Sequence, residues 1–170
     1  PADGRHMPAK ILIVDDAPLN RRILTSLLQP EGYILLETGN GREAVDLALR
    51  ELPDLIMLDI IMPLMNGYEV CSLLKQNTDS KNIPIIFISC IHDESFKIKC
   101  LELGISDYIT KPFNFEVLLS RIKNIISQQS SLRKTFQQHI EANPSEVAIS
   151  SADEEFIRQA LELVEKNISN

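Results

Sequence analysis

The chain has 170 residues, 44% of them apolar, and a formal net charge of −7 at pH 7. Its length suits one domain with a core of its own plus an extension. The negative charge disfavours a nucleic-acid surface, because phosphate backbones are bound mainly by clustered Lys and Arg. Three cysteines without a C-x-x-C pair favour reduced thiols, and so a cytoplasmic protein. No membrane span is expected, since the longest apolar stretch, 55–65, is interrupted by Asp59 and Pro63.

Residues 1–7 lack the apolar core of a signal peptide, and we interpret them as an expression remnant. After them, four short apolar runs each lead directly into polar side chains. The runs and the polar residues that follow are 11–14 with Asp15 and Asp16, 55–58 with Asp59, 85–88 with Ser89, and 108–110 with Lys111. Continuous apolar runs are typical of strands buried on both faces of a parallel sheet, where ligands bind beyond the carboxyl ends. We therefore expect these polar side chains to converge in one crevice.

Segments with helical spacing separate the apolar runs. In the first of them Leu19, Ile23 and Leu27 recur at every fourth position, as on the apolar face of a helix. Residues 33–37 supply one more strand. Because parallel neighbours need crossover connections, alternating strands and helices over 8–128 predict an α/β fold. We expect a doubly wound, flavodoxin-like, five-stranded parallel sheet in the order 2-1-3-4-5, flanked by helices.

The predicted crevice has a chemistry of its own. Three neighbouring carboxylates repel one another, which raises their pKa values unless a cation intervenes. Mg²⁺ favours a few carboxylates together with waters and a phosphate oxygen, so a magnesium ion and a phosphoryl group are expected to bind together. With Mg²⁺ present, Asp59 can act as a nucleophile toward a phosphoryl donor and form an aspartyl phosphate. Lys111 and Ser89 would then stabilise charge on the phosphoryl oxygens.

In combination these motifs resemble the receiver domain of bacterial two-component response regulators, the CheY-like domains. The resemblance covers residues 10–127 and is carried by Val-Asp15-Asp16, Leu-Asp59-x-x-Met-Pro63-x-x-x-Gly67, Ser89 after a strand, and Lys111-Pro112. It implies that a histidine kinase or phosphotransfer domain phosphorylates Asp59, and that the resulting change of conformation controls an output, expected to be transcription. The domain would be a signalling phosphoacceptor that assists its own phosphorylation and dephosphorylation, not an enzyme.

The same resemblance implies a role for each residue of the crevice. The magnesium ligands would be the side chains of Asp16 and Asp59 and the backbone carbonyl of Ile61, with Asp15 acting through water. The phosphoryl group would pair with Lys111, ahead of a cis proline, and the switch that reports phosphorylation would be Ser89 with Tyr108.

Residues 129–170 differ in character from the domain before them. An apolar stripe prolongs the last helix of the domain toward Pro144, and Ser151 with Glu154 makes a capping box that opens a further helix. We expect a helical linker or a dimerisation extension, truncated before an output domain. The segment resembles the connector that precedes an AraC-type helix-turn-helix domain in hybrid two-component regulators. The alternative is an amphipathic tail through which two copies form a homodimer.

Other functions fit the sequence less well. An aspartate-nucleophile phosphohydrolase of the haloacid-dehalogenase type characteristically has a second aspartate two residues after the nucleophile, and here that position is Ile61. A receiver-like interaction module that is never phosphorylated would keep the fold without affinity for Mg²⁺. A dinucleotide-binding domain is disfavoured because no G-x-G-x-x-G follows the first strand.

Overall fold

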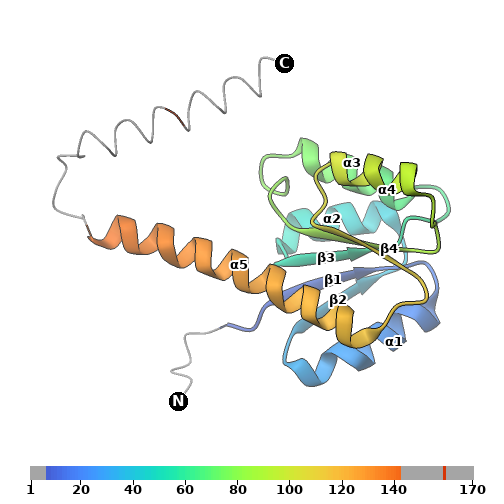
Figure 1. Ribbon diagram of the computed structural model, residues 1–170, viewed down its shortest axis with the longest axis horizontal. Coiled ribbons are helices and arrows are strands. Elements are labelled where there is room, and N and C mark those ends of the chain that lie inside the picture. Colours follow the sequence, from blue (N-terminus) through green and yellow to red (C-terminus); the bar gives the residue numbers. More distant parts are fainter. Residues whose placement is uncertain (1–6, 143–158, 160–170) are drawn as a thin grey trace. The chain divides into compact units, whose positions relative to one another are not determined.

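The computed structural model describes residues 7–142 and residue 159. Its centre is a five-stranded parallel sheet in the order β2-β1-β3-β4-β5 (Figure 1), which confirms the predicted doubly wound fold. The strands are β1 (Lys10–Val14), β2 (Ile34–Thr38), β3 (Leu55–Leu58), β4 (Ile85–Ser89) and β5 (Asp107–Thr110). Strands β1 and β3, which are not consecutive in the chain, lie side by side with Val14 opposite Leu58.

Helices cover both faces of the sheet. Helices α2, α3 and α4 share one hydrophobic core with it, whereas α1 and the first part of α5 share the other, as Figure 1 shows. The helical segments are α1 (Pro18–Leu28), the 3-10 turn η1 (Gln29–Glu31), α2 (Gly41–Glu51), α3 (Gly67–Gln76), α4 (Glu94–Glu102) and α5 (Phe115–Ala142). Right-handed crossovers between parallel strands place helices on the two faces in this way.

The apolar runs of the sequence form strands because both of their faces are buried. In β1, Ile11 and Ile13 lie in the core beneath α1 and α5, whereas Leu12 and Val14 lie in the core beneath α2 and α3. Successive side chains of a strand point to opposite faces of the sheet. In a strand whose two faces are both buried, every side chain lies in a hydrophobic core, so all of its positions are apolar. The polar residues are consequently displaced to the strand ends, where the candidate site lies.

The structure corrects one detail of the sequence interpretation. Helix α1 forms as expected, but Leu19 on the predicted apolar face is 67% exposed, and Ile23 is exposed as well. The side chains that α1 buries against the sheet are Leu24 and Leu28. The helix carries apolar residues on two overlapping i, i+4 rows, and only the row that faces the sheet is covered.

The chain falls into two units, residues 1–129 and 130–170. The predicted helix that begins at Ser151 lies, apart from residue 159, outside the described residues. Among the helices of the described part, none has the length and apolar content needed to cross a membrane.

Candidate phosphoacceptor and metal site

Three carboxylates meet at the carboxyl ends of β1 and β3. Asp15 and Asp16 directly follow β1, Asp59 directly follows β3, and one oxygen from each lies within 4.8 Å of the others. The pairing of the two strands brings them together, since the N–H of Asp59 donates to the carbonyl of Val14 at 2.9 Å. Asp15 and Asp59 are buried, at 2% and 8% exposure. The predicted acidic cluster therefore exists as a geometric unit.

The cluster is electrostatically unfavourable for Asp59. Burial, together with the nearby carboxylates of Asp15 and Asp16, raises the pKa of Asp59 from 3.8 to about 6. The ammonium of Lys111 and the N–H of Ile61, at 3.4 Å from Oδ1, act in the opposite direction without cancelling this effect. A divalent cation would relieve the repulsion, and oxygen-only donors suit Mg²⁺. The residues present thus fit a magnesium ion.

Lys111 enters the cluster from the end of β5. Its N–H donates to the carbonyl of Ser89 at 2.8 Å, and its peptide bond to Pro112 is cis. The Nζ atom lies 3.2 Å from Oδ2 of Asp15 and 3.7 Å from Oδ2 of Asp59. Burial acts to lower the pKa of Lys111, but these two carboxylates outweigh it and raise the pKa above its ordinary value. A cationic group therefore faces the nucleophile candidate.

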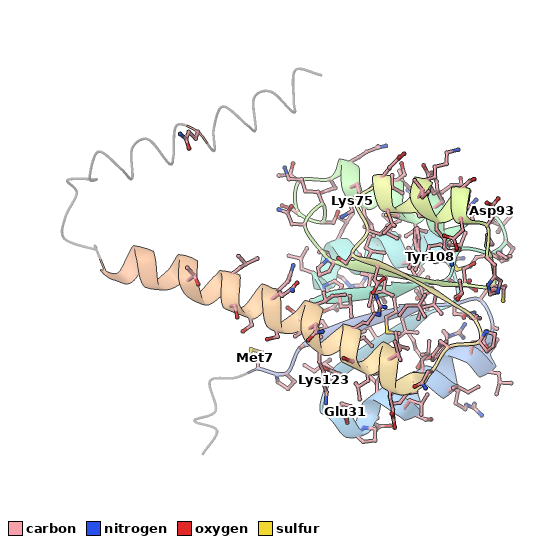
Figure 2. All side chains as sticks on the ribbon, viewed as in Figure 1. Met7, Glu31, Lys75, Asp93, Tyr108 and Lys123 are labelled. Carbon is pink, nitrogen blue, oxygen red and sulfur yellow. The ribbon has the colours of Figure 1, made fainter. Side chains whose placement is uncertain are left out.

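Ser89 and Tyr108 both form hydrogen bonds with the backbone of Ile91. The buried hydroxyl of Ser89 accepts a hydrogen bond from the N–H of Ile91 at 3.2 Å, and the hydroxyl of Tyr108 donates to the carbonyl of Ile91 at 2.8 Å. Burial raises the pKa of Tyr108 above its ordinary value. Figure 2 shows Tyr108 on the same side of the domain as Asp93, which caps α4. The β4–α4 loop thus connects the two predicted switch residues.

The Tyr108 ring is enclosed by aromatic and cationic side chains. Phe87 and Phe96 meet it edge-on, with ring centroids 6.3 Å and 6.4 Å away. The Nζ of Lys97 lies 5.7 Å from the centre of the ring, within the range of a cation–π contact. These contacts link β5 to α4. Movement of the Tyr108 ring would therefore disturb α4.

The backbone of the β3–α3 loop presses against the candidate nucleophile at Gly67. A Cβ atom there would collide with the carbonyl oxygen of Asp59 and lie 2.9 Å from the Cα of Ile60. The N–H of Gly67 also donates to the carbonyl of Ile60 at 2.8 Å. Asn66, just before it, caps α3 through a capping box with Glu69. The loop therefore has no space for a side chain at this position.

Replacing Gly67 by alanine is expected to destabilise the protein by about 1 to 3 kcal/mol, because backbone atoms have to move to accommodate the methyl group. Urea unfolding measures the change. The matched control is Gln76→Ala, at an exposed position of the same helix, which we expect to stay near the parent value. Equal unfolding midpoints for the two variants would contradict the close approach.

The structure brings Asp15, Asp16, Asp59 and Lys111 into one cluster and ties Ser89 to it through the N–H of Lys111. Sequence reasoning missed Arg21, whose guanidinium donates to the backbone carbonyl of Asp15. The one available signal was a cation near the start of α1, where the helix dipole disfavours positive charge.

Comparison with known proteins agrees with this geometry. Residues 11–123 match the family described as response regulator receiver domain. The curated relatives include histidine kinase P4 of Formosa agariphila, which is 39% identical over 160 residues, or 94% of this chain. That alignment spans 12% of the kinase's own length. A second alignment, with a probable transcriptional regulator ycf27 of Guillardia theta, spans 50% of that regulator's length.

Solved structures show the same fold. A putative response regulator from Chloroflexus aurantiacus is 34% identical with a TM-score of 0.67, covering 71% of this chain and 99% of that one. The receiver domain of sensor histidine kinase PA1611 from Pseudomonas aeruginosa, solved with a magnesium ion in its active-site cleft, is 27% identical with a TM-score of 0.66 and the same coverage. These comparisons do not support the predicted AraC-type connector. They do confirm the predicted family: the chain belongs to the response regulator receiver domains of two-component signalling.

Proposed function

We propose that this chain is the phosphoacceptor of a two-component phosphorelay, with Asp59 as the residue that takes the phosphoryl group. The observation that carries the proposal is the buried Asp59 carboxylate, within 4.8 Å of two other carboxylates and 3.7 Å from the ammonium of Lys111. A candidate nucleophile, a candidate metal site and a cation thus lie in one cluster. Few other groups are needed, because phosphoryl transfer is promoted chiefly by positioning and neutralisation of charge.

In the proposed reaction an Oδ atom of Asp59 attacks the phosphorus of a phosphohistidine. The P–O bond forms as the P–N bond breaks, the bonding electron pair returns to the imidazole nitrogen, and the product is a mixed anhydride on Asp59. Lys111 neutralises a phosphoryl oxygen, and the hydroxyl of Ser89 donates to another. Asp16, Asp59 and the carbonyl of Ile61 would bind Mg²⁺, and Asp15 would act through water. The ion would neutralise further charge on the phosphoryl group. The apolar side chain of Ile61 offers no acid or base for a phosphohydrolase.

The proposed readout of phosphorylation runs through the β4–α4 loop. The Ser89 hydroxyl can donate to a phosphoryl oxygen while it accepts from the N–H of Ile91, but turning its side chain toward Asp59 would stretch the hydrogen bond to Ile91. Because the Tyr108 hydroxyl donates to the carbonyl of Ile91, a shift of this loop would move the Tyr108 ring relative to Phe96 and Lys97. In the proposed switch, contacts therefore run from Ser89 through Ile91 to Tyr108 and from there to Phe96 and Lys97 on α4.

The proposed donor is a histidine kinase or a phosphotransfer domain, a choice supported by the similarity to histidine kinase P4. We further propose that the domain comprises residues 8–128, that it works in the cytoplasm, and that it controls transcription, with the segment 129–170 as a linker or dimerisation extension. A homodimer formed through that segment is part of the same proposal.

The proposal is tested by incubating the chain with Mg²⁺ and a small phosphodonor such as phosphoramidate and measuring its intact mass. We expect one phosphoryl group per chain in the parent protein and none in Asp59→Asn. Replacing Mg²⁺ by excess chelator is expected to suppress the addition. An unmodified parent protein at saturating Mg²⁺ would support the interaction module that is never phosphorylated.

A further inference from the structure

The side chain of Arg21 connects α1, β2 and the acidic cluster. Its Nη1 lies 2.5 Å from the backbone carbonyl oxygen of Asp15, and its Nε lies 3.3 Å from Oε1 of Glu37 on β2. The other carboxylate oxygen of Glu37 accepts a hydrogen bond from the Thr25 hydroxyl at 3.2 Å. Two nitrogens of the guanidinium therefore have hydrogen-bond partners, Nη1 on the Asp15 carbonyl and Nε on Glu37. The Arg21 side chain is 19% exposed and that of Glu37 is 48% exposed, so water reaches the ion pair more readily than the part-buried hydrogen bond to Asp15.

The β2–α2 loop is shaped to admit this guanidinium. A Cβ atom at Gly39 would lie 2.5 Å from Nη1 of Arg21 and 3.4 Å from the carbonyl oxygen of Asp15. The N–H of Asp15 donates to the carbonyl of Thr38 at 3.1 Å, so the end of β1 is already held against the end of β2. The absence of a side chain at Gly39 leaves space for Arg21 beside that junction.

We infer that Arg21 is a positioning residue for the magnesium ligand Asp16, an inference that rests on the proposed function. The carbonyl of Asp15 belongs to the peptide unit that joins Asp15 to Asp16. Its orientation therefore sets the direction from which the Asp16 side chain leaves the backbone. A hydrogen bond from a guanidinium is stronger than one between neutral groups, and the planar fork of arginine suits two fixed partners. Arg21 thus acts on the metal site through the backbone and not by touching the ion.

A purely structural role for Arg21 makes a different prediction. If the residue only ties α1 to β2 through Glu37, its removal lowers the free energy of unfolding and leaves the affinity for Mg²⁺ unchanged. Partners that orient metal ligands, in contrast, typically change metal affinity by about 10- to 100-fold when they are lost. Affinity and stability measured on the same variants separate the two roles.

Three variants and one control provide the test. Arg21→Met removes the donor, Arg21→Lys retains a cation with a shorter reach, and Gly39→Ala displaces the guanidinium while leaving its charge in the protein. The control is Lys10→Met, which breaks the ion pair with Glu51 (3.1 Å) at the opposite end of β1. Lys10 and Glu51 are partly buried, as Arg21 is, but lie away from the acidic cluster.

The measurements are the dissociation constant for Mg²⁺ by calorimetry, the urea midpoint, and the rate of phosphoryl addition from phosphoramidate against Mg²⁺ concentration. We expect Arg21→Met to weaken Mg²⁺ binding by about tenfold, Gly39→Ala to weaken it in the same direction, and Arg21→Lys to recover part of the loss. The Mg²⁺ concentration for half-maximal phosphorylation should rise by the same factor, with the rate at saturation close to that of the parent chain. Lys10→Met should alter only the urea midpoint.

The inference is overturned if Arg21→Met and Gly39→Ala bind Mg²⁺ as tightly as the parent, whatever their urea midpoints. If Arg21→Met does not fold, Gly39→Ala and Arg21→Lys still decide the question through the same dissociation constants. A parent chain that binds Mg²⁺ and gains a phosphoryl group keeps the proposed function intact even when the inference fails. A parent chain that does neither removes both.

Discussion

Replacing Lys111 by methionine is expected to slow the proposed phosphoryl transfer to Asp59 by on the order of 100-fold, the loss typical when one charge-stabilising donor is removed from a reaction centre. In the parent protein the Nζ of Lys111 lies 3.2 Å from Asp15 and 3.7 Å from Asp59. Methionine keeps most of the length of the side chain but supplies no charge to the transferring phosphoryl group. The variant also loses a cation that opposes the rise in the pKa of Asp59.

The rate is measured as the growth of the phosphorylated mass with time at saturating Mg²⁺ and a fixed phosphodonor concentration. Lys123→Met is the matched control, because it removes an ion pair of similar length, 3.3 Å to Glu31. Figure 2 labels both residues, and Glu31 lies in η1, ahead of β2, whereas the acidic cluster follows the carboxyl ends of β1 and β3. Equal rates for Lys111→Met and Lys123→Met would remove Lys111 from the proposed reaction.

Replacing Asp59 by asparagine is expected to raise the stability of the metal-free protein near neutral pH. The folded state raises the pKa of Asp59 from 3.8 to about 6, so the folded protein binds this proton more tightly than the unfolded chain does. Asp59 therefore costs nothing well below pH 3.8 and becomes progressively destabilising as the pH rises from about 4 through about 6. The shift corresponds to on the order of 2 to 3 kcal/mol. Asparagine resembles the protonated form and avoids this cost.

Urea unfolding of the parent and Asp59→Asn between pH 4 and pH 8, with chelator present, measures the difference. It should be small at the acidic end, grow through about pH 6 and level off above it. Adding Mg²⁺ should then stabilise the parent more than the variant, because ligands that bind the folded state stabilise it by mass action. Asp46→Asn, at an exposed position on α2, is the control for loss of one negative charge. A constant difference between parent and Asp59→Asn across this pH range would show that Asp59 titrates normally.

The fold was predictable because the central strands are buried on both faces. A run such as 55–58 has no polar position and is followed at once by Asp59, which fixes both the strand and its carboxyl end. Helix α1 was harder, since its sequence offers two apolar rows. Leu19 and Ile23 stay exposed, whereas Leu24 is covered by the sheet, a choice that depends on tertiary packing and not on helical period.

The acidic cluster was predictable for a related reason. Parallel strands end at one edge of the sheet, so side chains placed directly after β1, β3 and β5 have to meet there. Contacts with the backbone were not predictable. Arg21 reaches a carbonyl of Asp15, and Tyr108 reaches a carbonyl of Ile91. A carbonyl acceptor imposes no residue type, so the sequence does not show which backbone group either side chain reaches.

The central claim is that Asp59 accepts a phosphoryl group, and the most direct measurement is to locate that group. Borohydride reduces an aspartyl phosphate to homoserine, so treating the phosphorylated chain with borohydride and sequencing its peptides by mass spectrometry marks the modified residue. The account predicts homoserine at position 59, formed only when Mg²⁺ and the phosphodonor were both present. Homoserine at Asp15 or Asp16 instead, or a phosphorylated chain that yields none, would contradict it.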